Sequence, residues 1–251
     1  LFDEIKITPN KKFNLKVNNP NVPKDENNLC YKAYFEMKKK FPQISPVSIE
    51  LSKNIPIGSG LGGGSSNCAS VMLGLSKLFS LNVNLTLLKE IASKLGSDIS
   101  FFFDGGTQLG QGFGGDLKKI SLPKINYILI LLPDINISTS WAFNNLKNSL
   151  YEESIKSKFS DIHRLKFKWK SMQKFFENDF ESIVFRTYPR IGDLKKKLLQ
   201  NGASYASLSG SGSTVFGIFD DFKTVLNAEK KINQIKTHLV KPIKHKKIFE
   251  Y

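Results

Sequence analysis

The sequence is poor in the residues that build disulfide frameworks and zinc centres. It has two cysteines, Cys30 and Cys68, and three histidines, His163, His238 and His245. Two cysteines in separate helix-like patterns do not make a disulfide framework, and they favour a reducing compartment. The histidines are scattered without the spacing of metal ligands, so we expect no zinc site.

Long apolar runs and acidic residues are also scarce. No apolar stretch approaches the length of a transmembrane span, so we expect no membrane partner. The 251 residues include 37 basic and 22 acidic ones, a formal net charge of +15. Such an excess is typical of nucleic-acid-binding proteins, but lysine-rich solvated faces or a phosphorylated substrate account for it equally well. Because no stacking aromatics are interleaved with the lysines, we expect no nucleic-acid partner.

A glycine-rich stretch lies between a strand pattern and a helix pattern. Five of the seven residues from 58 to 64 are glycine, which lets the backbone adopt positive φ and approach a ligand closely. Residues 46–51 alternate like a half-buried strand, and apolar residues recur at helical spacing over 68–79. Ser65, Ser66 and Asn67 are favoured N-cap types. The pattern predicts backbone amides presented at a helix N-terminus, a geometry that binds phosphate.

Three common interpretations of this stretch do not fit. A flexible linker would have polar, non-periodic flanks. The G-x-G-x-x-G match over 58–63 lacks the acidic residue of dinucleotide-binding folds, because residues 81–84 read Leu-Asn-Val-Asn. A Walker A loop needs Lys and then Ser or Thr after its last glycine, where Gly64 and Ser65 stand.

Residues 56–62 instead resemble the P-x-x-x-G-L-G signature of the superfamily of galactokinase, homoserine kinase, mevalonate kinase and phosphomevalonate kinase (GHMP kinases). Residues 60–67, Gly-Leu-Gly-Gly-Gly-Ser-Ser-Asn, resemble the 4-diphosphocytidyl-2-C-methyl-D-erythritol kinases in particular. The resemblance implies an α+β protein with the GHMP kinase fold. Its N-terminal α/β domain of the ribosomal-protein-S5-like type would span 1–122, and a ferredoxin-like α+β domain would span 123–251.

In that family the loop holds the phosphates of ATP, and a divalent ion, Mg²⁺, neutralises their charge. Ser65 or Ser66 is the nearest hydroxyl candidate for the metal, although the wider superfamily has G-L-G-S-S with serines at the positions of Gly63 and Gly64. Lys53 is either a nucleotide contact or a solvated lysine. The nucleotide-binding residues that the resemblance implies are Lys53, Pro56, Ile57, Gly58, Ser59, Gly60, Leu61, Gly62, Gly63, Gly64, Ser65 and Ser66.

One carboxylate, Asp98, stands ahead of the apolar run 99–103. From the residues alone it is either a helix cap or a working group. Residues 96–102 resemble the G-A-D-V-P-F-F element of the family, in which the aspartate is catalytic, although Ser97 and Ser100 replace Ala and Pro. The resemblance therefore implies that Asp98 is the catalytic residue, contacting the substrate as general base or as hydroxyl-orienting group.

Residues 134–143 read as a strand end leading into a helix capped by Ser138 or Thr139. They resemble the I-P-T-x-x-x-F element that contacts the cytidine end of the substrate. By that match Thr139 supplies a hydrogen bond and Phe143 a stacking face; without it, Phe143 is a core aromatic. Residues 204–219 read as a strand, a second Gly/Ser loop and a strand, and they resemble the second superfamily signature, M-S-G-S-G-x-x-x-F, which packs beside the first loop, with Leu208 in the Met position. A polar hairpin turn is the alternative.

The remaining pattern predicts the other elements. Strands over 3–8 and 13–17 are expected to pair as an antiparallel hairpin, and residues 105–116 read as short strands with tight turns rather than a second phosphate loop. Residues 178–181 resemble a family element that we interpret as structural. The helix over 154–176 is interpreted as a core helix with a solvated basic face rather than a membrane or partner motif. Further helices are expected at 28–41, 84–96, 189–199 and 221–237, and strands at 125–133 and 238–243.

The family begins with a P-A-K-[IL]-N-L strand and a G-Y-H segment, which carry a catalytic lysine and part of the cytidine pocket. Residues 1–17 match neither, and the sequence starts at Leu1 without an initiator Met. We therefore expect a sequence truncated at its N-terminus and a chain that, as it stands, is impaired or inactive.

The resemblance implies an ATP-dependent kinase of the 2-hydroxyl of 4-diphosphocytidyl-2-C-methyl-D-erythritol, in plastid and bacterial isoprenoid precursor synthesis. Homoserine kinase, mevalonate kinase and a nucleotide-binding pseudoenzyme remain the alternatives. Abundant Lys and Asn indicate an AT-rich genome, so we expect a plastid stroma, or the cytoplasm if the source is bacterial. A monomer or homodimer is expected.

Overall fold

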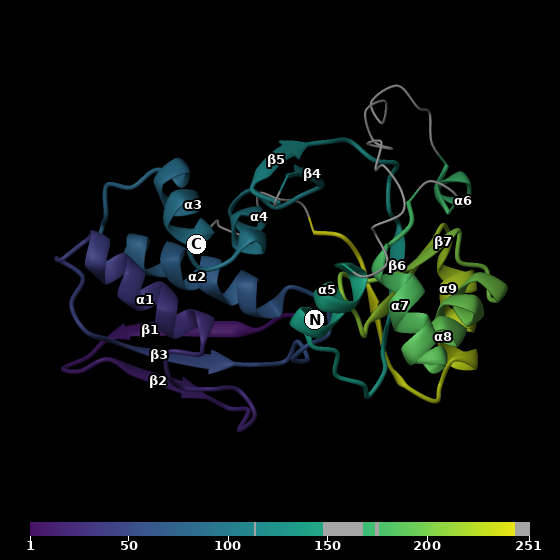
Figure 1. Cartoon of the computed structure of the whole chain (residues 1–251), viewed down its shortest axis with the longest axis horizontal. Coiled ribbons are helices and arrows are strands. Elements are labelled where there is room, and N and C mark those ends of the chain that lie inside the picture. Colours follow the sequence, from purple (N-terminus) through teal and green to yellow (C-terminus); the bar gives the residue numbers. More distant parts are fainter. Residues whose placement is uncertain (113, 148–167, 174–175, 244–251) are drawn as a thin grey trace. The chain divides into compact units, whose positions relative to one another are not determined.

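The computed structural model describes residues 1–112, 114–147, 168–173 and 176–243, and the chain divides into two compact units (Figure 1). The described residues up to Ile57 and from Gly62 to Ile120 form the first unit. Those from Gly58 to Leu61 and from Ser121 onward form the second. The glycine-rich stretch therefore contributes residues to both units.

The first unit contains a three-stranded sheet with strand order β1-β3-β2. The central strand β3 (Val47–Ser52) pairs antiparallel with β1 (Glu4–Pro9) and parallel with β2 (Asn14–Val17). The predicted hairpin between the first two strands is therefore wrong, because β3 lies between them. The physical reason is burial: β3 is buried at most positions, whereas β1 and β2 alternate, and the most apolar strand gains most at the centre.

Helices α1 (Leu29–Lys40), α2 (Gly63–Leu78) and α3 (Leu85–Ser93) pack in the same unit, and α1 lies beside α2 (Figure 1). The starts of α1 and α3 are as predicted. The Asn28 side chain accepts a hydrogen bond from the Cys30 amide at 2.8 Å, and Asn84 accepts one from the Leu87 amide at 2.9 Å. Both cysteines are free and buried in this core, and burial raises the pKa of the Cys30 thiol to about 12.

The rest of the first unit is short elements. A 3₁₀ turn, η1 (Ser97–Ser100), leads into α4 (Phe101–Asp104). Strands β4 (Gln108–Gln111) and β5 (Asp116–Lys119) form an antiparallel hairpin, which confirms the expected short strands with tight turns.

The second unit contains a four-stranded antiparallel sheet with strand order β7-β8-β6-β9. Its strands are β6 (Tyr127–Leu132), β7 (Tyr205–Leu208), β8 (Val215–Phe219) and β9 (Lys236–Val240). Helices α7 (Phe180–Thr187), α8 (Pro189–Gln200) and α9 (Phe222–Lys231) pack in the same unit (Figure 1). As predicted, α8 opens on a proline and ends just before a glycine, Gly202, at φ +94°.

The C-terminal part of the prediction was wrong in its boundaries. α9 ends at Lys231, six residues before the predicted end, and β9 begins at Lys236. The reason is tertiary: residues 236–240 pair with β6, whose backbone groups need partners on both sides. Most of the helix predicted over 154–176 lies outside the described residues, which include α6 (Trp169–Met172) from it. No helix in the described part is long and apolar enough to cross a membrane.

Candidate active site

The glycine-rich stretch ends in a sharp helix start at Gly62. Gly62 adopts a left-handed φ of +66° and is the N-cap of α2. A Cβ at this position would lie 2.7 Å from the Phe102 ring, so both conformation and space require glycine. The first amides of α2 are those of Gly63, Gly64 and Ser65, which have no partner within the helix and sit at its positive end.

The prediction that residues 65–67 cap this helix was wrong, because α2 begins at Gly63. The serines lie in its first turn instead. The Ser66 amide donates to the Gly62 carbonyl at 2.9 Å, and Ser66 Oγ donates to the Gly63 carbonyl at 2.9 Å. Both serines therefore lie in the first turn of α2, where the helix amides have no partner within the helix.

The middle of the stretch is held by the second Gly/Ser loop, between β7 and β8. Ser209 Oγ donates to the Gly60 carbonyl at 2.9 Å, and the Thr214 amide donates to the Ser59 carbonyl at 3.2 Å. Gly60 has φ +74°, and a Cβ there would lie 1.9 Å from the Ser209 carbonyl oxygen. The second loop is therefore more than a polar turn: it packs against residues 58–61, as the resemblance implied.

Two polar side chains support the second loop. Asn178 Nδ2 donates to the carbonyls of Leu208 and Gly210 at 2.9 and 2.8 Å. The Glu181 carboxylate accepts from the Leu208 amide at 2.9 Å and pairs with Lys195 at 2.5 Å. The structural interpretation of residues 178–181 is confirmed. These side chains fix the end of β7, from which the loop starts.

Lys53 is not a solvated lysine. Its ammonium pairs with the Asp3 carboxylate at 2.8 Å and donates to the Ile55 carbonyl, and the two charged side chains are 7% and 1% exposed. Burial alone would raise the pKa of Asp3, but hydrogen bonds from Lys53 and from the amides of Ile55 and Asn54 outweigh it and hold the pKa below its ordinary value. Sequence reasoning missed Asp3, a carboxylate next to a strand with no local motif.

Asp98 lies in η1, and its side chain is exposed. Its carboxylate accepts a hydrogen bond from Ser97 Oγ at 3.3 Å. Within the described residues it caps no helix amide, so the structure does not support the cap interpretation. η1 packs against α2, and Phe102, one turn later, lies against Gly62. In the first unit, the segment of Asp98 therefore packs against α2, the helix that follows the glycine-rich stretch.

Thr139 and Phe143 lie on α5 (Thr139–Lys147) in the second unit. Ser138 caps this helix, since its Oγ accepts from the Trp141 amide at 3.3 Å. Thr139 Oγ1 is 3.4 Å from Ser211 Oγ of the second Gly/Ser loop. Phe143 is 51% exposed and meets Phe180 edge to face at 5.0 Å, so it is not a core aromatic.

The described residues contain no group of three or more His, Cys, Asp or Glu side chains that could hold a metal ion by themselves. An ion at the loop would therefore be held by phosphate oxygens and few protein ligands, which is how Mg²⁺ is commonly bound. The hydroxyls of Ser65 and Ser66 in the first turn of α2 fit that role. Ser66 Oγ already donates to the Gly63 carbonyl, but its lone pairs can still face an ion.

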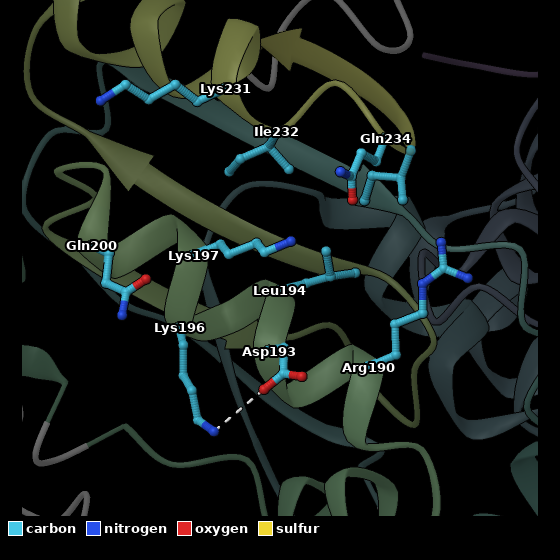
Figure 2. A pocket seen from close by; sticks show the side chains of 10 residues that line it. Arg190, Asp193, Leu194, Lys196, Lys197, Gln200, Lys231, Ile232 and Gln234 are labelled. Atoms are coloured by element: carbon cyan, nitrogen blue, oxygen red, sulfur yellow. Dashed lines mark hydrogen bonds and ion pairs between the residues drawn. The ribbon is translucent and has the colours of Figure 1, made fainter.

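A pocket of about 420 Å³ lies on the second unit, between α8 and the end of α9 (Figure 2). Leu194 and Ile232 line it together with basic side chains such as Lys197, and Lys196 is paired with Asp193 at 3.4 Å. It contains none of the residues that the sequence assigned to the site. Exposed lysines occur throughout the described part of this basic chain, so the basic lining of the pocket does not by itself indicate a site.

Comparison with known proteins identifies the family of the chain. Residues 28–106 match the model of the GHMP kinases N terminal domain, and residues 164–236 match that of the GHMP kinases C terminal. A 4-diphosphocytidyl-2-C-methyl-D-erythritol kinase of Prosthecochloris aestuarii is 35% identical over 234 residues, which are 92% of this chain and 82% of that protein. The chain belongs to this family of GHMP kinases.

Solved structures show that this GHMP kinase has the fold of the superfamily. A crystal structure of 4-(cytidine 5'-diphospho)-2C-methyl-D-erythritol kinase matches with a TM-score of 0.74 and 25% identity, covering 94% of this chain and 84% of that one. A homoserine kinase from Cytophaga hutchinsonii matches with a TM-score of 0.76 at 19% identity, covering 97% and 86%. The second likeness concerns the fold alone. The expected fold class is therefore confirmed.

Proposed function

We propose that this GHMP kinase transfers the γ-phosphoryl group of ATP to the 2-hydroxyl of 4-diphosphocytidyl-2-C-methyl-D-erythritol, in the non-mevalonate route to isoprenoid precursors. The observation that carries the proposal is the left-handed Gly62 that opens α2 at the end of a glycine-rich loop, where the first helix amides have no partner within the helix. The 35% identity to a kinase named for this substrate supports the choice of acceptor.

In this proposal residues 56–66 bind the nucleotide. The backbone amides of Gly63, Gly64 and Ser65 hold phosphate oxygens at the positive end of α2. A bound Mg²⁺ would neutralise charge on the transferring group, with Ser65 or Ser66 as its protein hydroxyl ligand. Gly60 lies close to the second Gly/Ser loop and Gly58 lies close to Asn136, and a side chain at either glycine has no room.

Asp98 is the proposed catalytic residue. The bond between the γ-phosphorus and the β–γ bridging oxygen breaks as the substrate 2-oxygen bonds to the same phosphorus, and ADP is the leaving group. The proton of the 2-hydroxyl passes to the Asp98 carboxylate, which first orients that hydroxyl. The exposure of Asp98 and its single weak side-chain bond support this role, because the carboxylate is free to receive a substrate.

Thr139 and Phe143 are proposed to bind the cytidine end of the substrate. Phe143 offers a half-exposed ring for base stacking, and Thr139 offers an exposed hydroxyl near the second Gly/Ser loop. We further propose a monomer or homodimer in a plastid stroma, or in the cytoplasm if the source is bacterial. The bacterial origin of relatives such as that of Prosthecochloris aestuarii and the Lys-rich composition support this setting.

The test is phosphoryl transfer from ATP by the purified protein. The diphosphocytidyl substrate, homoserine and mevalonate are offered in parallel. We expect turnover of the diphosphocytidyl substrate alone. Turnover of homoserine or mevalonate instead would contradict the substrate assignment, and ATP binding without any turnover would indicate a pseudoenzyme.

The role of Asp98 is tested by Asp98→Asn, which keeps the size of the side chain and removes its basicity. We expect kcat to fall by at least about a hundredfold, while nucleotide affinity stays within about twofold. Asp116→Asn is the matched control, since Asp116 is an exposed carboxylate of the same unit that meets Lys118 only at 3.9 Å. Near-normal kcat in Asp98→Asn would contradict the proposed role.

A further inference from the structure

The Asp3 carboxylate contacts the chain at both ends of the glycine-rich stretch. Its Oδ1 accepts from the amides of Asn54 and Ile55 at 2.6 and 2.7 Å, just before the stretch. Its Oδ2 accepts from Asn67 Nδ2 at 2.9 Å, just after it, and pairs with Lys53 at 2.8 Å. A buried carboxylate is tolerated only with such partners. One side chain therefore fixes the distance between the entry to the loop and the first turns of α2.

The Lys53 ammonium lies directly against the first residue of α2. A Cβ on Gly63 would lie 3.0 Å from Lys53 Nζ and 3.0 Å from Ile55 Cγ2. A buried cation at the positive end of a helix is repelled by the helix dipole, and the Asp3 carboxylate offsets that repulsion. The same packing explains the glycine at position 63, where the wider superfamily has serine: a side chain there would press on Lys53 and Ile55.

We propose that Asp3 and Lys53 are positioning residues for the phosphate loop. Their buried ion pair holds residues 53–55 and the start of α2 in the geometry that binds nucleotide phosphates, without touching the nucleotide. The inference rests on the proposed function in one respect, namely that this loop binds ATP. It gives Lys53 a role through the loop, in place of the direct nucleotide contact that the sequence suggested.

The contacts predict how individual substitutions act. In Asp3→Asn the remaining oxygen can still accept from the two backbone amides, but the new amide group faces two donors, Asn67 Nδ2 and Lys53 Nζ. The Lys53 ammonium then lies beside Gly63 without the carboxylate that balances its charge, and it displaces the loop. Lys53→Met removes the cation and leaves Asp3 with three hydrogen bonds, so its effect should be smaller. The double variant leaves no unpaired ammonium and should recover part of the affinity lost in Asp3→Asn.

The experiment is calorimetric titration with Mg·ADP, in the absence of acceptor, well below the thermal midpoint of each variant. We expect Asp3→Asn to weaken nucleotide affinity about tenfold or more, and the double variant to bind more tightly than Asp3→Asn. Steady-state kinetics should show the loss in KM for ATP, with KM for the acceptor within about twofold. Glu50→Gln is the matched control. Glu50 pairs with Lys16 at 2.9 Å on the same sheet, but the side chains are exposed, Lys16 by 62% and Glu50 by 45%. Nucleotide affinity should therefore not change in this variant.

Each outcome separates the two proposals. If the variants are less thermally stable but bind Mg·ADP as tightly as the wild type, the pair is merely structural and the inference is overturned. If the wild-type protein binds Mg·ADP but does not phosphorylate the diphosphocytidyl substrate, the substrate assignment fails and the positioning test still stands. If the wild type does not bind Mg·ADP, both proposals fail.

Discussion

At the scale of single residues, Asp3 is a buried carboxylate held by an ion pair and by hydrogen bonds. Its side chain is 1% exposed, and four donors from two segments, residues 53–55 and Asn67, surround it. The hydrogen bonds stabilise the carboxylate more than burial destabilises it, so its pKa in the folded protein lies below the ordinary value of 3.8. Folding is therefore coupled to the ionisation of this group.

The coupling gives a pH-dependent prediction. Because the pKa of Asp3 is lowered by folding, its ionised form stabilises the protein fully above the unfolded pKa, and this stabilisation is lost as pH falls through the lower folded pKa. Asp3→Asn should lower the free energy of unfolding by about 3 kcal/mol at pH 7, because it breaks a buried pair. The difference from wild type should shrink at about pH 3, as measured by urea denaturation at both pH values. An equal difference at both would contradict the coupling.

Asp3 and Asp98 also show what a sequence reveals about single residues. Asp98 stands within a contiguous run that resembles a family element, so a role could be predicted for it from its neighbours in the chain, and that role stays a prediction. The partners of Asp3 are 50 to 64 positions away, and two of them are backbone amides that carry no residue identity. Nothing in the residues around Asp3 distinguishes it from a solvated carboxylate beside a strand.

At the scale of elements, two glycines at the start of α2, Gly62 and Gly64, differ in whether they can be replaced by a residue with a Cβ. Gly62 is left-handed, and a Cβ on it would lie 2.7 Å from the Phe102 ring. Gly64 is exposed inside the helix, and a Cβ there would lie 3.5 Å from the Leu29 side chain, which is ordinary contact. Alanine is strained at the first position and favourable at the second. The same substitution should therefore have opposite effects two residues apart.

We expect Gly62→Ala to lower the free energy of unfolding by about 1 to 3 kcal/mol, and Gly64→Ala to leave it unchanged or raise it by up to about 1 kcal/mol. Urea denaturation of the two variants beside wild type measures both. Each variant is the control for the other, since both add one methyl group to the same loop. A stable Gly62→Ala protein would show that the left-handed helix start is not required.

The elements themselves were predicted better than their connections. A capping side chain bonds to an amide two or three residues further on, so the helix start can be predicted from a few neighbouring residues. Four predicted helix starts are capped in this way, by Asn28, Asn84, Ser138 and Asp221. The start of α2 was misplaced because three favoured cap residues follow a glycine whose φ only the folded chain reveals. The order β1-β3-β2 was missed because strand pairing over long separations leaves no local pattern.

At the scale of the whole molecule, the net charge of +15 acts on substrates that are themselves anionic. Long-range attraction of this kind raises the rate of encounter and is screened by salt, with a Debye length of about 10 Å at 0.1 M. We expect kcat/KM for ATP to fall severalfold as KCl rises from about 0.05 to 0.3 M, with kcat nearly constant. Potassium acetate in place of the chloride controls for specific anion effects. A kcat/KM independent of salt would show that the excess charge is unrelated to substrate capture.

Family and fold were accessible from the sequence because the decisive motifs are contiguous. The two glycine loops and the Asp98 segment each occupy fewer than about a dozen neighbouring residues, and such motifs keep their meaning without a structure. The supports of those loops could not be found in this way. Asp3, Asn178 and Glu181 act through contacts that only the folded chain creates.

The central position of β3 also has a consequence for synthesis on the ribosome. β1 and β2 are made before β3, yet among the described residues both pair with β3 alone, which follows β2 by about thirty residues. Until β3 has emerged, both strands therefore have unpaired edges. Ribosome-bound chains that end before Val47 should lack this sheet, and chains that extend past Ser52 into α2 are the first that can complete it.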